Sequence, residues 1–137
     1  MNPSIKFLFP LLIAVNVFVQ AADWPTWRGA NGNGLSDEKD IPGNWSSTEN
    51  VAWQAELPGP GNSSPIVAKG KVFVTQATKD GKKRALLCFD RQTGKKLWER
   101  TTLFPDKEPT HKTNPFCSAS PATNGKVVVV ALGSAGM

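Results

Sequence analysis

The chain has 137 residues, which is enough for one ordinary domain, and a formal net charge of +5. It contains no Tyr but five Trp, twelve Gly and eleven Pro, a composition that favours short strands and turns over helices. No window beyond the N-terminal segment has the apolar spacing of an amphipathic helix, so we expect an all-β fold.

Residues 1–21 have the pattern of an export signal. Lys6 is their only charged side chain, an apolar run follows over residues 7–19, and small residues precede a cleavage site after Ala21. The apolar run is too short to span a bilayer comfortably, so cleavage is predicted to release a chain without a stable transmembrane span. This chain would be exported to the periplasm or the extracellular space. The alternative is an uncleaved membrane anchor, because a single Lys is a thin cationic region.

Residues 22–62 are predicted to form an N-terminal strap and a closing strand. The Gly-rich part of the strap lacks the Gly-Lys-Ser/Thr ending and the preceding strand of a phosphate-binding loop. We therefore expect a turn-rich surface segment. Trp24, Trp27 and Trp45 are expected to attach this strap to the body of the protein by burying their rings.

Five strands are predicted between residues 51 and 100. The closing strand is residues 51–57, which end at a Pro-Gly-Pro-Gly run, and four more strands follow between residues 63 and 100. Their connections are short, with turns at Lys69-Gly70 and at residues 79–82. In the second of these turns, Asp80-Gly81 is typical of a type I′ conformation. Such short links favour an antiparallel sheet in up-and-down order.

The hairpin from Cys88 to Trp98 is the most distinctive stretch. Asp90 can accept hydrogen bonds from backbone N–H groups two residues ahead, Thr93 is another turn former, and Gly94 can take the positive φ that closes the turn. Burying about 200 Å² of Trp98 would contribute at most about 5 kcal/mol. An isolated hairpin offers nothing against which to bury that ring, so Trp98 indicates a neighbouring structural unit.

The pattern restarts at residue 118. Residues 118–129 mirror residues 63–74, and Pro65 and Pro121 lie 56 positions apart. Self-similarity at this period is typical of stacked repeats, in which each sheet buries its faces against its neighbours. The second unit follows a longer connection than the first, which predicts an inserted loop within residues 103–117.

These features resemble the pyrroloquinoline-quinone-like (PQQ-like) β-propeller repeat proteins. Their repeats carry the docking pattern Ala-x-Asp-x-x-x-Gly-x-x-x-Trp, which this chain matches at Asp90, Gly94 and Trp98, with Cys88 in place of Ala. The two Ser-Pro openings of the repeats and the segment 23–34 are similar to the secreted bacterial members of the family.

The resemblance implies four-stranded antiparallel blades, in which the Trp of one blade stacks over the docking turn of the next. Residues 51–57 would then be the outer strand of the last blade, residues 63–117 a first complete blade with its inserted loop, and residues 118–137 the truncated start of a second. We therefore expect an N-terminal fragment with about one and a half blades, an incomplete ring and the remaining propeller blades missing. Trp98 would be less buried than in a closed ring, or would pack against the strap or the insertion.

Two classes of function follow from the resemblance. One is a non-catalytic binding or scaffold module for proteins or other components of the cell envelope, similar to the outer-membrane assembly factor of this fold. The other is part of a PQQ-dependent quinoprotein dehydrogenase, which would need the quinone and calcium. Such dehydrogenases often carry an adjacent pair of Cys, which this chain lacks, so the binding module without a cofactor is favoured.

A candidate ligand rim follows from the strand order. In an up-and-down blade the connection after the second strand and the one leaving the fourth emerge on the same face, which brings residues 79–84 beside the loop that holds the only His. The residues of this anion-attracting rim are Lys82, Lys83, Arg84, His111 and Lys112. No catalytic triad, paired-carboxylate site or nucleic-acid motif stands out, and a lone His has no partner for metal binding.

Cys88 and Cys117 are the only two Cys. They form no C-x-x-C pair, so their spacing supports neither a zinc site nor a redox dithiol. Cys88 lies in a predicted strand, where it would pack as a small apolar residue. Whether the two Cys pair with each other stays open at this point.

Overall fold

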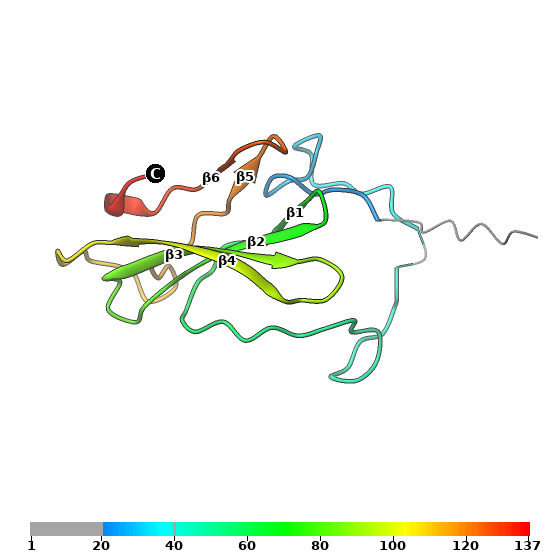
Figure 1. Ribbon diagram of the computed structural model, residues 1–137, viewed down its shortest axis with the longest axis horizontal. Coiled ribbons are helices and arrows are strands. Elements are labelled where there is room, and N and C mark those ends of the chain that lie inside the picture. Colours follow the sequence, from blue (N-terminus) through cyan, green and yellow to red (C-terminus); the bar gives the residue numbers. More distant parts are fainter. Residues whose placement is uncertain (1–20, 40) are drawn as a thin grey trace, which may run out of the picture.

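The computed structural model describes residues 21–39 and 41–137, so the expected export signal lies outside the described residues except for Ala21. The strands are β1 (Ile66–Ala68), β2 (Lys71–Ala77), β3 (Lys83–Asp90), β4 (Lys96–Leu103), β5 (Ala122–Thr123) and β6 (Val128–Val129), followed by a 3-10 turn, η1 (Gly133–Ala135). They form a four-stranded antiparallel sheet in the order β1-β2-β3-β4 and a two-stranded sheet of β5 and β6 (Figure 1). The all-β fold and the up-and-down order are confirmed, and the described sheets form no closed ring.

The turn between β1 and β2 is the tightest connection of the sheet. Ala68 faces Lys71 in the register, and Lys69 and Gly70 both have positive φ values, 48° and 71°. Positive φ at both central residues is the property of a type I′ turn.

The type I′ turn predicted at Asp80-Gly81 is wrong. Gly81 has a φ of 72°, but Asp80 is not among the residues with positive φ. The connection between β2 and β3 is longer than two residues, and the Asp80 carboxylate instead accepts hydrogen bonds from the Thr78 hydroxyl (2.6 Å) and from Lys82 N (3.2 Å). Local side-chain bonds of this kind stabilise a wider turn.

Both faces of the four-stranded sheet are covered. One buried cluster contains Ile66, Phe73, Leu86 and Cys88, and the other contains Val74, Ala85, Leu87 and Phe89. The first cluster packs against Val128 and Val130 of the second repeat, and the second packs against Ala55. Figure 1 accordingly shows β5 and β6 on one side of the sheet and the chain leading to β1 on the other. Residues 84–89 of β3 are therefore all buried, because a strand presents successive side chains alternately to its two faces.

Residues 51–57, predicted to be a strand, form none in the structure. The segment packs against a face of the sheet through Ala55, and none of the described strands lies alongside it to complete a hydrogen-bonded ladder. Its sequence has the alternation of a strand, but alternation specifies a buried face and not a pairing partner.

The N-terminal strap crosses the edges of both repeats. Trp24 pairs with Val67 of β1 through backbone hydrogen bonds of 2.7 and 2.9 Å, and the Pro25 carbonyl accepts a hydrogen bond of 2.9 Å from Thr123 N of β5. The Asp23 carboxylate accepts a further bond of 3.0 Å from Lys69 N. The strap thus connects the first strands of the two repeats.

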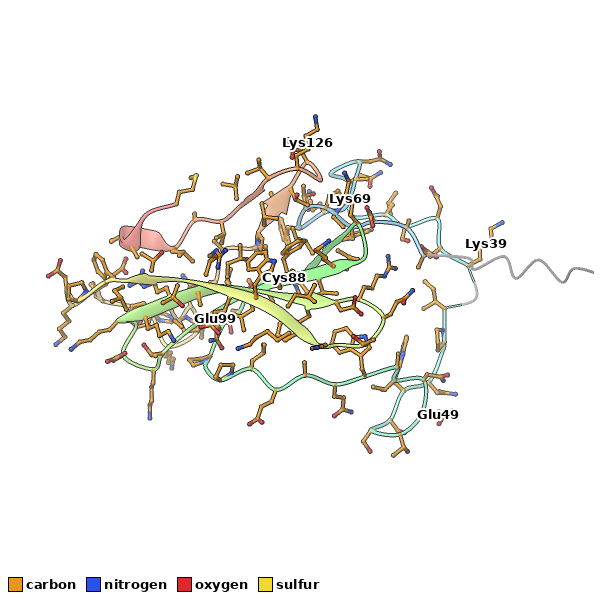
Figure 2. All side chains as sticks on the ribbon, in the orientation of Figure 1. Lys39, Glu49, Lys69, Cys88, Glu99 and Lys126 are labelled. Carbon is orange, nitrogen blue, oxygen red and sulfur yellow. The ribbon has the colours of Figure 1, made fainter. Side chains whose placement is uncertain are left out.

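Of the three Trp residues expected to attach the strap, only Trp24 does so. Its ring lies over Gly29, where a Cβ atom would come within 2.8 Å of it. Trp27 and Trp45 are 62% and 59% exposed, so the expectation is wrong for both. Trp45 belongs to a loop that closes on itself, for example through the 2.8 Å hydrogen bond from Asn50 Nδ2 to the Asn44 carbonyl. This loop projects from the body together with Glu49 (Figure 2).

None of the described residues belongs to a helix of the length and apolarity needed to cross a lipid bilayer.

Candidate functional site

The docking turn, residues 90–94, is built around one carboxylate. Asp90 Oδ1 accepts hydrogen bonds from Thr93 N (2.8 Å), the Thr93 hydroxyl (2.8 Å) and Gln92 N (3.1 Å). Gly94 closes the turn with a φ of 70°, and its N–H donates to the Asp90 carbonyl at 2.9 Å. The Thr93 hydroxyl, followed by the Thr93 backbone N–H, holds the pKa of Asp90 below its ordinary value. The turn is therefore held by an ionised carboxylate that accepts three of its hydrogen bonds.

Trp53 docks on this turn. Its indole Nε1–H donates a 2.7 Å hydrogen bond to the Arg91 carbonyl, and its ring lies over Gly94, where a Cβ atom would come within 2.5 Å of it. A Trp that precedes the blade thus stacks over the docking turn of that blade, in the manner that the resemblance implies. Trp53 lies 45 positions before Trp98 in the chain.

Trp98 occupies the corresponding place toward the second repeat. It is half-buried, its ring centroid lies 5.9 Å from that of Phe73, and the Arg100 guanidinium lies 5.8 Å from it. A cavity beside it is also lined by Gly125 and Lys126, which follow β5. Trp98 therefore faces the second repeat and is not fully buried.

The two Cys are separate free thiols, and both are buried. Cys88 lies opposite Trp98 in the β3–β4 register, within the core of the blade (Figure 2). Burial raises the pKa of both thiols above the ordinary value, which disfavours the reactive thiolate. The question of a disulfide between them is thus answered: each packs independently.

Arg84, one of the predicted rim residues, lies in the interior. Its side chain is 2% exposed and is sandwiched between two rings, 5.0 Å from the Phe104 centroid and 4.7 Å from the Phe116 centroid. It donates hydrogen bonds to the Glu108 carboxylate and to the Leu132 carbonyl. The Arg84 guanidinium and then the Ser134 hydroxyl hold the pKa of Glu108 below its ordinary value. Arg84 thus joins β3, the inserted loop and the second repeat.

The turn after β2 and the inserted loop do meet, as the strand order predicts. Phe104 N donates a 2.8 Å hydrogen bond to the Lys82 carbonyl, and the Phe116 ring packs against Gly81. A cavity of about 280 Å³ is lined by residues of the inserted loop, among them Glu108 and His111, by Arg84 of β3 and by Ala131 and Gly133 of the second repeat. The structure thus brings two of the rim residues, Arg84 and His111, to one cavity.

The other rim residues are exposed. Lys83 forms a 3.4 Å ion pair with Glu99, and the His111 ring hydrogen-bonds the Thr113 hydroxyl through Nδ1 at 2.8 Å. Lys82 and Lys112 are exposed on the same two segments. The surface of the rim therefore consists of Lys82, Lys83, His111 and Lys112, while the charge of Arg84 is paired inside. The sequence carried no signal for this pairing, because Glu108 lies in an irregular loop.

Across residues 21–39 and 41–137, no group of three or more His, Cys, Asp or Glu side chains comes together in a way that could hold a metal ion.

Comparison with known proteins identifies the repeat. A search of curated proteins found no match. A protein-family model described as outer membrane protein assembly factor BamB matches residues 44–137, which is more than half of the chain. The matched residues include the docking turn, the Trp that covers it and the start of the second repeat. The chain therefore belongs to this BamB-like family of PQQ-like repeat proteins.

Proposed function

We propose that the protein is a non-catalytic binding or scaffold module of the cell envelope, and that it reaches the envelope by export. The observation that carries this proposal is the match of residues 44–137 to the family described as an outer membrane protein assembly factor. The Trp53 contact with the docking turn supports it, because such contacts make stacked repeats into a rigid platform.

The way the chain uses its reactive side chains also supports a binding role. The Asp90 carboxylate accepts hydrogen bonds within the docking turn, and the Glu108 carboxylate accepts hydrogen bonds from Arg84 and Ser134. Both thiols are buried with raised pKa values. A side chain that is engaged in this way stabilises the fold and has little capacity left for proton transfer or nucleophilic attack.

The surface proposed for the partner is the exposed part of the rim, Lys82, Lys83, His111 and Lys112. Lys82 and Lys83 lie where the turn after β2 enters β3, His111 and Lys112 lie on the inserted loop, and the chain as a whole carries a formal charge of +5. Positive charge on neighbouring loops attracts acidic segments and increases association rates. We therefore propose that an acidic segment of an envelope protein binds there.

Site-specific photo-crosslinking in the intact cell envelope tests this proposal. A photoreactive amino acid at position 82 or 112 is expected to give crosslinks to a small set of envelope proteins. Lys95 is a matched control, because it is an exposed Lys in the turn after β3, which lies at the opposite end of the strands. Equal crosslinking from position 95, or none from positions 82 and 112, would contradict the rim as the binding surface.

The quinoprotein alternative makes a different prediction. A quinone-dependent enzyme would bind PQQ and calcium tightly, and the described residues do not gather a set of acidic and His ligands for calcium. We expect equilibrium titration of the protein with PQQ and calcium ions to show no saturable binding. Tight binding of both would replace the scaffold proposal with a dehydrogenase.

A further inference from the structure

A second surface, distinct from the rim, lies where the strap crosses the two repeats. A cavity of about 480 Å³ is lined there by Trp27, Asn62, Ser64, Ser118 and Ser120. These residues come from three segments: the strap, the chain entering β1 and the chain entering β5. All four polar residues of the lining are uncharged, and the fifth residue is an exposed Trp.

The position of Trp27 follows from the pairing of the strap with β1. Trp24 and Val67 form an isolated antiparallel bridge, which fixes the strap on β1 three residues before Trp27. A turn fixes the strap just beyond this point, because the Thr26 hydroxyl donates to the Gly29 carbonyl at 2.7 Å and Gly29 N donates to the Thr26 carbonyl at 3.0 Å. The backbone of Trp27 is thus held firmly while its ring remains 62% exposed.

Two serines of the cavity, Ser64 and Ser120, occupy equivalent positions in the two repeats. Ser64 and Ser120 each precede the Pro that opens a repeat, and Ser64 N donates a 2.8 Å hydrogen bond to Ser120 Oγ. Ser120 Oγ acts as an acceptor in this bond, so the hydroxyl keeps its proton for a further acceptor. The repeats therefore bring a hydroxyl donor from the second unit next to the backbone of the first.

Two more groups that line the cavity can still accept hydrogen bonds. Asn62 Nδ2 donates a long bond of 3.5 Å to the Thr113 carbonyl, which leaves its carbonyl oxygen to accept. The Ser118 hydroxyl donates to the Pro115 carbonyl at 2.6 Å and can still accept through its lone pairs. The cavity thus offers both donors and acceptors but no charge.

We propose that this cavity binds a neutral carbohydrate chain. One face of the Trp27 indole is covered by the Arg28 guanidinium, 5.2 Å from its centroid, and the other face can stack on the apolar C–H face of a sugar ring. Ser120 and Asn62 supply the donor and the acceptor that sugar hydroxyls require, and none of the five lining residues is charged. This site goes beyond the partner binding proposed for the rim and lies on other residues.

Isothermal titration calorimetry with three neutral oligosaccharides tests the site. Chitohexaose represents N-acetylated wall-type glycans, and cellohexaose and maltohexaose represent glucans. We expect saturable binding of at least one of them, and a preference for chitohexaose or for the glucans identifies the source of the ligand. The absence of saturable binding to all three would overturn the proposal.

Two variants assign the binding to the cavity. Trp27→Ala is expected to weaken binding about tenfold, because the stacking surface is lost. Trp45→Ala is the matched control, since Trp45 is similarly exposed but does not line the cavity. Asn62→Ala is expected to weaken binding as well, and circular dichroism checks that each variant is folded. Equal weakening by Trp27→Ala and Trp45→Ala would show that binding is not located in this cavity.

Discussion

At the scale of single residues, Gly94 is the position where the docking contact depends most on the absence of a side chain. Its backbone has positive φ, and the Trp53 ring occupies the space that a Cβ atom would need. Gly70 has almost the same φ, 71°, but nothing lies within 4 Å of its Cβ position. The two glycines separate the cost of backbone strain from the cost of displacing the Trp.

We expect Gly94→Ala to lower the free energy of unfolding by about 3 kcal/mol and Gly70→Ala by only about 1 kcal/mol. Both variants strain the backbone, but only the first must push Trp53 from the docking turn. Urea denaturation followed by circular dichroism measures the two values. Similar losses in the two variants would mean that the Trp53 contact adds nothing to stability.

Asp90 predicts an acid dependence of stability. Because its pKa is lowered in the folded state, its contribution is present above the ordinary pKa of Asp and is lost as the pH falls through the lowered value. The melting temperature of Asp90→Asn is therefore expected to be lower at neutral pH and to change less between about pH 5 and about pH 2 than that of the natural sequence. The control is Asp37→Asn, because Asp37 is also exposed. If the melting temperature of Asp90→Asn depended on pH in the same way as that of the natural sequence, Asp90 would not be the source of the acid dependence.

At the scale of elements, Arg84 holds the inserted loop and the second repeat on β3. Replacing it with Met keeps the length of the side chain but removes the bonds to Glu108 and to the buried Leu132 carbonyl. We expect a loss of about 2 to 4 kcal/mol in the free energy of unfolding. Arg100→Met is the control, because the exposed Arg100 also stacks on an aromatic ring, and it should cost less than about 1 kcal/mol. Chemical denaturation distinguishes the two, and equal costs would rule out the loop anchor.

The sequence was informative about elements whose partners are close in the chain. The strands of the blade and the docking turn were predicted because alternation, Asp90 and Gly94 act within a few residues. Most of the failures depend on distant partners: residues 51–57 lack a neighbouring strand, Trp27 and Trp45 stay exposed, and Arg84 meets a Glu in an irregular loop. The exception is the turn at Asp80-Gly81, where a local hydrogen bond from the Thr78 hydroxyl to the Asp80 carboxylate accompanies a wider turn. The strand order did predict that the turn after β2 and the inserted loop meet, but the sequence did not predict the pairing of Arg84 with Glu108.

At the scale of the whole molecule, the strap makes the two repeats depend on each other. Trp24 bonds to β1 and Pro25 accepts a bond from β5, so a change in the strap should loosen both strands. Trp24→Pro removes the N–H that donates to the Val67 carbonyl, and it also removes the ring that covers Gly29. We expect the hydrogen-exchange rates of the Val67 and Thr123 amides to increase about tenfold or more. Hydrogen exchange resolved to single residues measures these rates. The Leu87 amide, inside the blade, is the internal control, and unchanged exchange at Thr123 would contradict the link.

The double attachment of the strap also orders the events of synthesis. The strap leaves the ribosome before either repeat, yet its bond to Thr123 cannot form until β5 has been made. During that interval the strap can bond to β1 through Trp24 but not to the second repeat. The strap therefore completes its contacts only after β5 has been made, although it is synthesised before either sheet.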